Sequence, residues 1–331
     1  MKKGLGRFEF YLTQVQDLLT TAAMQKNPGL WLYQNNMRTP LFMLEGLAKL
    51  YSGIHNKKKF CKLKEHFKIL EDALGAIDYY DAFAKSFAAN KNIPAEIVQY
   101  LQAQTREKLQ RFNDLLTEEK WLINDKGRIK KIQKKLADAD WLKEKEEIKE
   151  IDKFYGSAIY KIAEFINNDK LHFTNVESDV HELRRKLRWL SIYPQAFQGC
   201  IQLSQTKNSP AFLAKYLTPE IINSPYNKLP DAGDCSCFLL LSKDHFYALS
   251  WMIAELGKLK DSGLGVIAIK EALQQNGKVN DEAAYKKAYE ILGASQPKLD
   301  EILRKSEAIC STYFHEHNLE HLVIGTAAAT K

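Results

Sequence analysis

Apolar residues recur every three or four positions along almost the whole of the 331-residue chain. This spacing places them on one face of a helix, so it predicts a chain built from amphipathic helices. In the first half, helices are expected from the N-terminus to about residue 25, from about 39 to 53, from about 59 to 88, and from residue 94 onward. The segment Asn27-Pro28-Gly29 is expected to stop the first of them.

The same periodicity continues through the second half. Helices are predicted at about 177–192, 195–206, 210–217, 241–275, 280–292 and 297–318. Residues 127–170 are dense in charge and are interpreted as a pair of exposed helices with ion pairs along their surfaces. A loop is expected over Thr218–Asp234, and Phe238–Leu241 is a candidate short strand with no evident partner. The fold class is therefore all-α, built from helical bundles.

Composition and charge add little to this prediction of the fold class. With 45% hydrophobic and 27% charged residues, the chain is an ordinary folded protein and not a disordered one. Its 48 Lys and Arg against 41 Asp and Glu leave a net charge of +7, which mildly favours an acidic partner. Five scattered cysteines predict reduced thiols and a cytoplasmic location. No apolar run is long enough for a membrane span, so no membrane partner is expected.

One segment, VHELRRKLRWL at 180–190, separates its basic and apolar side chains. Thr174 and Glu177 have the spacing of a capping box, which predicts a helix starting there. On that helix the basic residues fall within an arc of about 100°, and the apolar ones fall opposite. The basic face comprises His181, Arg184, Arg185 and Arg188; the apolar face comprises Val180, Leu183, Leu187 and Leu190.

Neighbouring cations repel one another, so something must offset the charge of this basic face. Acidic residues of other helices would do so if each arginine sat in a structural ion pair. An anion would also do so, because the planar guanidinium can bond two phosphate oxygens at once and histidine adds a charge near pH 6.5. Both alternatives stay open on the residues alone.

These residues resemble the signature helix of the CHAD family, the histidine-bearing α-helical domains. The family pattern is a histidine, an arginine three residues on and a basic residue seven on, which here are His181, Arg184 and Arg188. A second family feature is a later helix with Leu-Gly, two residues, a basic residue and Asp. The stretch Leu256–Asp261 (LGKLKD) is similar to it.

The family is a duplicated unit, and the first half of the chain resembles a degenerate copy. Asn35 and Arg38 stand in the places of the histidine and first arginine, and Leu74–Asp78 (LGAID) in the place of the Leu-Gly element. Because of Pro40, the helix is expected to start after Arg38. The paired elements are farther apart in the second half, so an inserted short helix and surface loop are expected at about 194–241.

The resemblance implies two four-helix-type bundles related by a pseudo-twofold axis, with residues 1–150 forming the first and 151–331 the second. It implies non-enzymatic binding of inorganic polyphosphate, association with polyphosphate granules, and no cofactor. The candidate binding residues are His181, Arg184, Arg185, Arg188, Lys260, Arg38, Lys57, Lys64 and Lys68. Asp78 and Asp261 are expected to pair with the signature arginines. The alternatives are a helical protein-interaction module whose basic face is an ion-pair network, and, less favoured, nucleic-acid binding.

Other candidate chemistry is weaker. The string His317-Asn-Leu-Glu320-His321 matches the His-x-x-Glu-His motif of some zinc proteases, but no acidic residue or histidine follows to complete the site, so a surface helix end is expected. Cys235-Ser-Cys237 lacks a second ligand pair. No nucleotide-binding glycine motif or catalytic serine motif occurs. Neither a metal nor a catalytic residue is predicted, and the sequence makes no prediction of oligomeric state.

Overall fold

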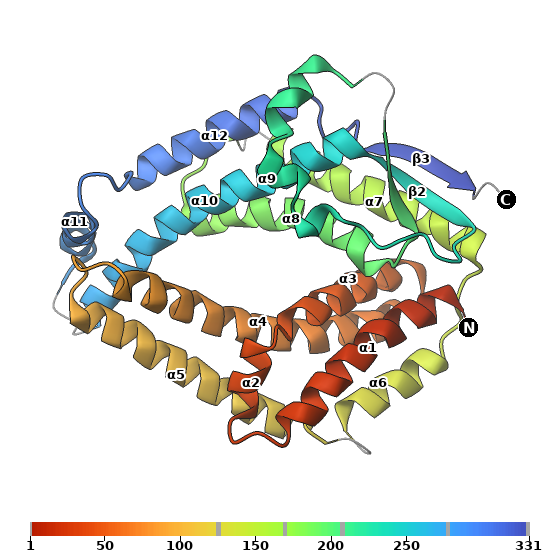
Figure 1. Cartoon of the computed structure of the whole chain (residues 1–331), viewed down its shortest axis with the longest axis horizontal. Coiled ribbons are helices and arrows are strands. Elements are labelled where there is room, and N and C mark those ends of the chain that lie inside the picture. Colours follow the sequence, from red (N-terminus) through yellow and green to blue (C-terminus); the bar gives the residue numbers. More distant parts are fainter. Residues whose placement is uncertain (1, 124–126, 168–170, 206–208, 276–278, 329–331) are drawn as a thin grey trace. The chain divides into compact units, whose positions relative to one another are not determined.

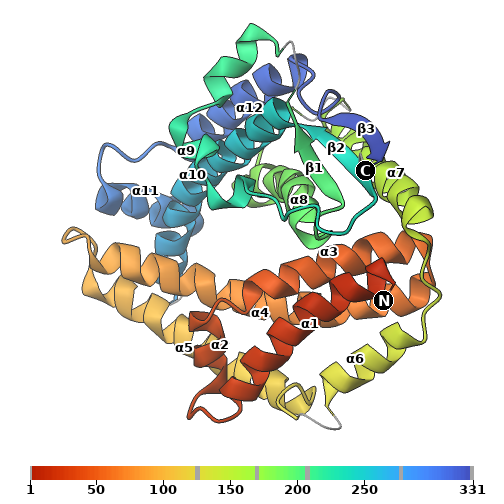
Figure 2. The ribbon, with the colours of Figure 1, turned by 45° about the vertical axis from the view of Figure 1, so that its right-hand side comes forward.

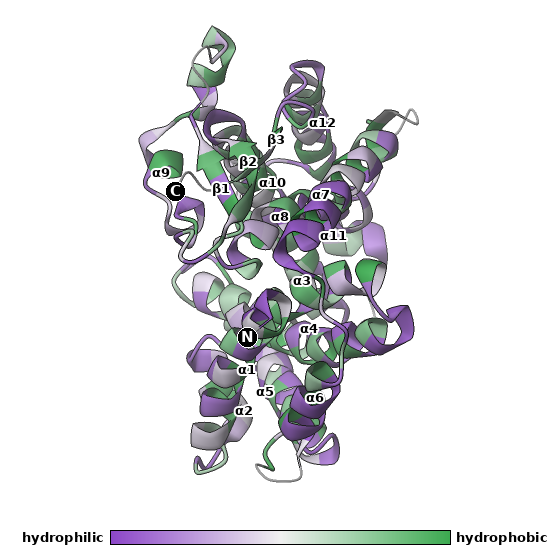
Figure 3. Cartoon of the chain, turned by 90° about the vertical axis from the view of Figure 1, so that its right-hand side faces the viewer, coloured by the Kyte–Doolittle hydropathy of each residue, from purple (hydrophilic) through white to green (hydrophobic). Residues whose placement is uncertain are grey.

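The computed structural model of the chain describes residues 2–123, 127–167, 171–205, 209–275 and 279–328. Helices dominate these residues, which confirms the all-α fold class, and a small three-stranded sheet accompanies them (Figure 1). Hydrophobic and hydrophilic residues are mixed along the main helices, as the sequence periodicity predicted (Figure 3). The chain divides into two compact units, each with its own core.

Unit 1 comprises residues 1–142 and 266–294. Its main helices are α3 (Arg38–Ile54), α4 (Lys57–Ala88) and α5 (Ala95–Glu118), with α3 packed on α4 and α4 on α5. The other elements are α1 (Lys3–Ala22), α2 (Pro28–Gln34), α6 (Arg128–Ala137), α11 (Asp281–Leu292) and the end of α10 (Lys243–Gln274). All of its secondary structure is therefore helical in the described residues.

Unit 2 comprises residues 143–265 and 295–331. Its long helices are α7 (Glu144–Asn167), α8 (Glu182–Ala196), the first two thirds of α10 and α12 (Leu299–His315). Shorter helical turns are η1 (Val176–His181), η2 (Ala211–Tyr216), α9 (Pro219–Ile222) and η3 (Pro225–Asn227). The strands are β1 (Ile201–Ser204), β2 (Cys237–Ser242) and β3 (Val323–Ala328), which lie side by side in Figure 2.

The small sheet corrects the prediction for residues 195–206. Helix α8 ends at Ala196 because Gln198 and Gly199 adopt left-handed backbone conformations, and β1 follows in place of a helix. The candidate strand at 238–241 is confirmed, but the expectation that it lacks partners was wrong. It is the central strand β2, parallel to β1 and antiparallel to β3.

The predicted insertion at 194–241 contains more structure than a short helix and a loop. It includes β1, η2, α9, η3 and the start of β2, and its residues 206–208 lie outside the described residues. The predicted loop at 218–234 holds α9 and η3. Cys235 is buried and Cys237 is half-buried, so neither lies on an exposed loop. Short helical turns such as these carry too little periodicity to be predicted.

Two further boundaries differ from the sequence-based expectation. Helix α2 begins one residue after Asn27, whose side chain accepts a hydrogen bond from the backbone of Leu30, so this asparagine caps a helix that the prediction lacked. The first unit boundary falls at residue 142 and not at 150. Residues 266–294, expected in the second bundle, belong to unit 1.

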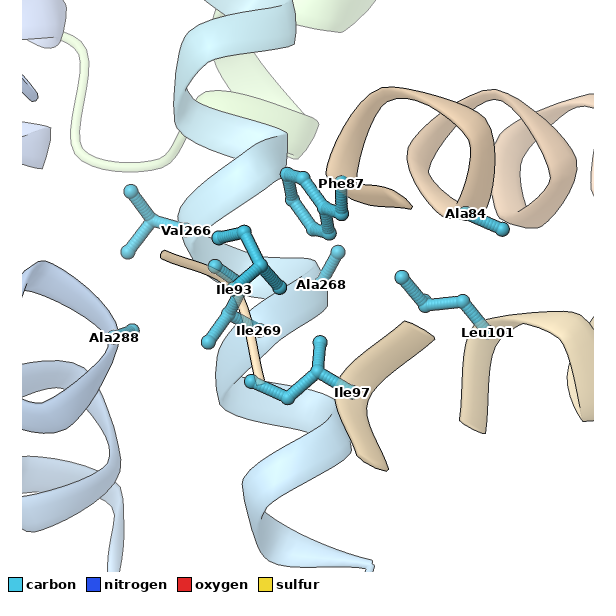
Figure 4. Close-up of a cluster of buried hydrophobic side chains, with 9 residues drawn as sticks. All are labelled: Ala84, Phe87, Ile93, Ile97, Leu101, Val266, Ala268, Ile269 and Ala288. Atoms are coloured by element: carbon cyan, nitrogen blue, oxygen red, sulfur yellow. The ribbon is translucent and has the colours of Figure 1, made fainter. Parts of the chain in front are cut away.

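The core of unit 1 includes a cluster formed by segments distant in the sequence. Phe87 and Ile93 come from the end of α4 and the turn after it, Ile97 from α5, and Ile269 from α10, and all point toward one another (Figure 4). Tyr80 and Tyr100 donate hydrogen bonds of 2.8 and 2.7 Å to the same oxygen of Glu271 beside this cluster. These contacts explain why the end of α10 belongs to unit 1.

The core of unit 2 is organised around α8. The side chains of Trp189, Tyr193 and Phe197 stack in sequence along this helix. The hydroxyl of the fully buried Tyr155 on α7 donates a hydrogen bond of 2.5 Å to the carbonyl oxygen of Leu190. Helix α8 is thus held on its apolar side. Among the described residues, no helix is both long and apolar enough to cross a membrane.

Replacing Ile97 by Ala is expected to lower the free energy of unfolding of unit 1 by about 2–4 kcal/mol, because it leaves a cavity in the core cluster. Ile69→Ala on α4 is the matched control, since Ile69 is 49% exposed; it is expected to change stability by about 0.5 kcal/mol or less. Urea denaturation measures both. Equal effects of the two substitutions would contradict this description of the core.

Candidate functional site

The predicted signature helix begins where expected, but its cap is different. Asn175, and not Thr174, caps it: its side-chain oxygen accepts hydrogen bonds from the backbone N–H groups of Glu177 and Ser178 at 2.8 and 3.1 Å. The hydroxyl and backbone N–H of Thr174 donate instead to Asp179. The predicted capping box is therefore wrong. The first turn, η1, is a π-helix that continues directly into α8.

The separation of basic and apolar faces on this helix is confirmed. The four apolar residues Val180, Leu183, Leu187 and Leu190 are all fully buried. The four residues of the basic face (His181, Arg184, Arg185 and Arg188) are half-buried or exposed. Because the apolar face is packed in the core, the basic face is directed away from the core.

Two members of the basic face are held by carboxylates of their own helix. The Nδ1 atom of His181 lies 2.8 Å from Oε1 of Glu177, and this contact lowers the pKa of the Glu177 carboxyl. Arg185 pairs with Glu182 at 2.6 Å, and Lys186 pairs with the same carboxylate at 3.1 Å. These are i,i+3 and i,i+4 pairs at a partly solvated surface, so each is weak.

Arg184 is held differently from its neighbours. Its Nε–H donates a hydrogen bond of 3.0 Å to the backbone carbonyl of Ile253 on α10. Its guanidinium lies against Gly257, where an added Cβ would be 3.0 Å from Nε and 3.2 Å from one terminal nitrogen. Among the described residues Arg184 forms no ion pair, although the charge of Asp261 acts on it. Burial lowers the pKa of the Arg184 guanidinium, and Asp261 opposes this.

The partner of Arg184 is a group that the sequence analysis did not identify. The carbonyl of Ile253 lies one helical turn before Gly257, on the same face of α10. No sequence signal singles out this carbonyl, because every residue carries a backbone carbonyl group. The expected ion pair between Asp261 and the signature arginine is replaced by a pair with Lys260 at 2.7 Å.

The remaining members of the predicted site in unit 2 are Arg188 and Lys260. Arg188 is half-buried one turn beyond Arg184, and its carbonyl accepts a hydrogen bond from the Ser191 hydroxyl. The Lys260 side chain is only 15% exposed and pairs with the neighbouring Asp261. Arg184, Lys260 and Asp261 are therefore brought into one region of α8 and α10 by the fold of unit 2.

Arg38 makes the corresponding contact in unit 1. Its guanidinium lies against Gly75 of α4, where an added Cβ would be 2.7 Å from a terminal nitrogen. The predicted pair with Asp78 is confirmed at 3.1 Å, and a second pair joins Arg38 to Glu71 at 2.6 Å. Helix α3 begins at Arg38 itself and not after it. An arginine thus packs on the glycine of the Leu-Gly element in each unit, whereas the pseudo-twofold relation stays a prediction.

Glu71, one of the two carboxylates paired with Arg38, also acts on a buried glutamate of α3. Glu45 is 93% buried on α3, and burial together with the negative charges of Glu71 and Asp72 raises its pKa to about 7, against the partial effect of Lys68. Arg38 is matched by two carboxylates, those of Glu71 and Asp78. Its charge is neutralised within unit 1, unlike that of Arg184 in unit 2.

The three lysines predicted on α4 differ from one another. Lys68 pairs with Asp72 at 2.5 Å. Lys57 is exposed in the first turn of the helix, and Lys64 is half-buried. Neither Lys57 nor Lys64 forms an ion pair within the part of the chain that the structure describes. Lys57 and Lys64 therefore retain their charge for an external partner.

The string His317–His321 does not lie on a helix end that could place both histidines together. Helix α12 stops at His315, and His317 has a left-handed backbone with φ of 54°. Its Nδ1 lies 3.6 Å from Glu320, whereas the His321 ring lies beside His245 at 5.6 Å between centroids. Within the described ranges, no three His, Cys, Asp or Glu side chains group as metal ligands would.

Comparison with protein-family models, with curated proteins and with solved structures returned no match for this chain in any of the three.

Gly257→Ala is expected to lower the free energy of unfolding by about 1 kcal/mol, because the new methyl group presses on Arg184 and disturbs its bond to Ile253. Gly156→Ala on α7 is the control, since nothing lies within 4 Å of its Cβ position. That variant is expected to gain about 0.5–1 kcal/mol through helix propensity. Thermal denaturation measures both, and a gain at Gly257 equal to that at Gly156 would refute the contact.

Glu45→Gln is expected to remove part of the pH dependence of stability. Because the pKa of Glu45 is raised from its ordinary 4.5 to about 7 in the folded chain, folding favours the protonated form. The wild type therefore loses stability relative to the variant as pH rises from about 4.5 through about 7. Denaturation at a series of pH values measures this, and parallel curves for the two proteins would contradict it.

Proposed function

We propose that the chain is a non-enzymatic polyanion-binding protein whose ligand is inorganic polyphosphate and whose main anchor is Arg184. The supporting features are the basic face of α8, its arginine on Gly257, and the resemblance of both elements to the CHAD family. In this proposal Arg188, Lys260 and His181 contribute further charge, and Arg38, Lys57, Lys64 and Lys68 have a secondary role.

The observation that carries the proposal is the incomplete pairing of Arg184. A guanidinium has five N–H donors, and the donors that protein groups leave unbonded can bond to an anion. Only one, Nε–H, is bonded within the described residues, to the Ile253 carbonyl. The Ile253 and Gly257 contacts fix the plane of the guanidinium. Its terminal nitrogens then present the fork that binds two oxygens of one phosphate.

Polyphosphate suits this surface better than nucleic acid does. Polyphosphate carries a charge on every phosphate and has no bases, so its binding needs cations but no stacking platform. Single-stranded nucleic acids are usually bound with exposed aromatic side chains as well. Neither η1 nor α8 contains an exposed large hydrophobic or aromatic side chain. A cytoplasmic location and association with polyphosphate granules belong to this proposal.

A second candidate function has its own supporting observations. His181 and Arg185 are each paired with a glutamate of the same helix, and Lys260 is paired with Asp261. A network of this kind is what a structural basic face in a protein-interaction module would show. Arg184 distinguishes the two candidates, because a purely structural face would place a carboxylate on its guanidinium as Glu71 is placed on Arg38.

Arg184→Ala is expected to weaken binding of long-chain polyphosphate by about tenfold or more at low salt, because it removes a charge-assisted bidentate contact. Arg184→Lys, which keeps the charge but loses the fork, is expected to fall between the wild type and the alanine variant. A filter-binding titration measures the affinities, and circular dichroism confirms that the variants fold. Added salt is expected to weaken wild-type binding steeply, since bound phosphates release counterions.

Arg304→Ala is the matched control for this experiment. Arg304 lies exposed on α12 in the same unit, and its Nε–H also donates to a backbone carbonyl, that of Asp300, at 3.3 Å. This variant is expected to bind polyphosphate as the wild type does. The proposal fails if wild-type binding is unmeasurable at low salt, if the Arg184 and Arg304 variants bind equally, or if RNA competes as well as polyphosphate at equal phosphate concentration.

A further inference from the structure

Two histidines of unit 2 lie beside each other, where β2 runs into α10 and where β3 begins. His245 is in the first turn of α10, and His321 lies two residues before β3. Their rings are 5.6 Å apart between centroids and are inclined to each other by 50°. These two residues are named the histidine pair. They are far apart in the sequence, so the fold of unit 2 brings them together.

The backbone of the small sheet fixes the position of the histidine pair. Strands β2 and β3 are antiparallel, and the backbone N–H of Ser242, the last residue of β2, donates a hydrogen bond of 2.9 Å to the carbonyl of Leu322. Leu322 directly follows His321, and Ser242 lies three residues before His245. Main-chain bonds therefore hold both segments in place close to the two rings, which is the arrangement that preorganises a binding site.

His245 uses one of its ring nitrogens and leaves the other without a partner. Its Nδ1 lies 2.8 Å from the hydroxyl oxygen of Ser242, which is fully buried. Its Nε2 is also buried and has no hydrogen-bond partner among the described residues, although His245 as a whole is 95% buried. A buried polar atom without a partner is costly. A histidine that binds a metal through Nε2 carries its proton on Nδ1, and the Ser242 hydroxyl is placed to accept the hydrogen bond from that N–H.

The charges beside the histidine pair favour a cation. Asp244 is 94% buried in the first turn of α10, and its carboxylate accepts hydrogen bonds from Gln205 and Ser209 but forms no ion pair with any described residue. The first turn of a helix carries a partial positive charge, which Asp244 offsets. Burial first, and then the charge of His321, lower the pKa of His245 against the effect of Asp244. The His245 imidazole is therefore neutral at neutral pH and keeps a lone pair for a metal ion.

We propose that the histidine pair binds one Zn²⁺ ion through one imidazole nitrogen of each residue, with water as the remaining ligands. Imidazole is a ligand that Zn²⁺ prefers, and two imidazoles bound to one tetrahedral Zn²⁺ at about 2.0–2.1 Å have ring centroids about 5 Å apart. The observed separation is close to this, and the inclined rings allow one nitrogen of each to face a common ion. His321 is exposed, so the ion has access from solvent.

The number of protein ligands sets the strength expected of this site. No third His, Cys, Asp or Glu side chain joins the pair within the described ranges. Two protein ligands bind Zn²⁺ less tightly than the four of a closed structural site. The bound ion ties the turn before β3 to the start of α10. This role goes beyond polyphosphate binding and uses no residue of α8.

Titration of the full chain with Zn²⁺ in phosphate-free buffer, followed by NMR of the imidazole nitrogens, tests the proposal. The signals of His245 and His321 are expected to shift together and to saturate at one ion per chain. Bound Zn²⁺ is also expected to raise the melting temperature, because it binds the folded chain. His321→Ala is expected to lower the affinity for Zn²⁺ by about tenfold or more. Ser242→Ala is expected to lower it by about tenfold, because it removes the hydrogen bond that orients the His245 ring.

His317→Ala is the matched control. It removes an exposed histidine four residues before His321, and it is expected to bind Zn²⁺ as the wild type does. Circular dichroism checks that each variant folds, and His321→Ala changes only an exposed side chain. Three results would overturn the proposal: no shift of either ring signal in excess Zn²⁺, an equal loss of affinity in the His317 and His321 variants, or a shift of His321 while His245 stays unchanged, which would mean an adventitious ion only.

Discussion

The candidate site depends on the contact between one arginine and the backbone of a facing helix. Arg184 lies against Gly257, and its Nε–H bonds to the carbonyl of Ile253. A Cβ at position 257 would lie only 3.0 Å from Nε of Arg184, so the glycine permits this close approach of the arginine to α10. The fully buried Leu183, Leu187 and Leu190 of α8 fix the side of this helix from which Arg184 projects. A charged group thereby becomes rigid without being neutralised by a carboxylate.

The same contact in unit 1 has a different electrostatic setting. Arg38 lies against Gly75 in the same manner, but Glu71 and Asp78 bind its guanidinium. These carboxylates neutralise the charge of Arg38, so little positive potential remains to attract an anionic ligand. Two arginines that each lie against a glycine can therefore have different roles. Arg38 forms internal ion pairs, whereas Arg184, as proposed, binds an anion. The distinction lies in the neighbouring acidic residues.

The sequence predicted the helices well because their periodicity extends over many residues, as in α4 and α10. It also placed the basic and apolar faces of α8 correctly, since that separation follows from helix geometry alone. Strand β1 was missed because it has only four residues and its partner, β2, lies more than 30 positions away. The bond to Ile253 was missed because a backbone carbonyl has no signature in a sequence.

The central claim is that the terminal nitrogens of Arg184 bind phosphate while Nε stays on the Ile253 carbonyl. NMR of the arginine side chains in the full chain, titrated with polyphosphate, tests this most directly. The account predicts that the Arg184 terminal nitrogens shift on binding while the Nε–H signal keeps its protection from exchange. Polyphosphate that binds while the Arg184 signals stay unchanged would contradict the account.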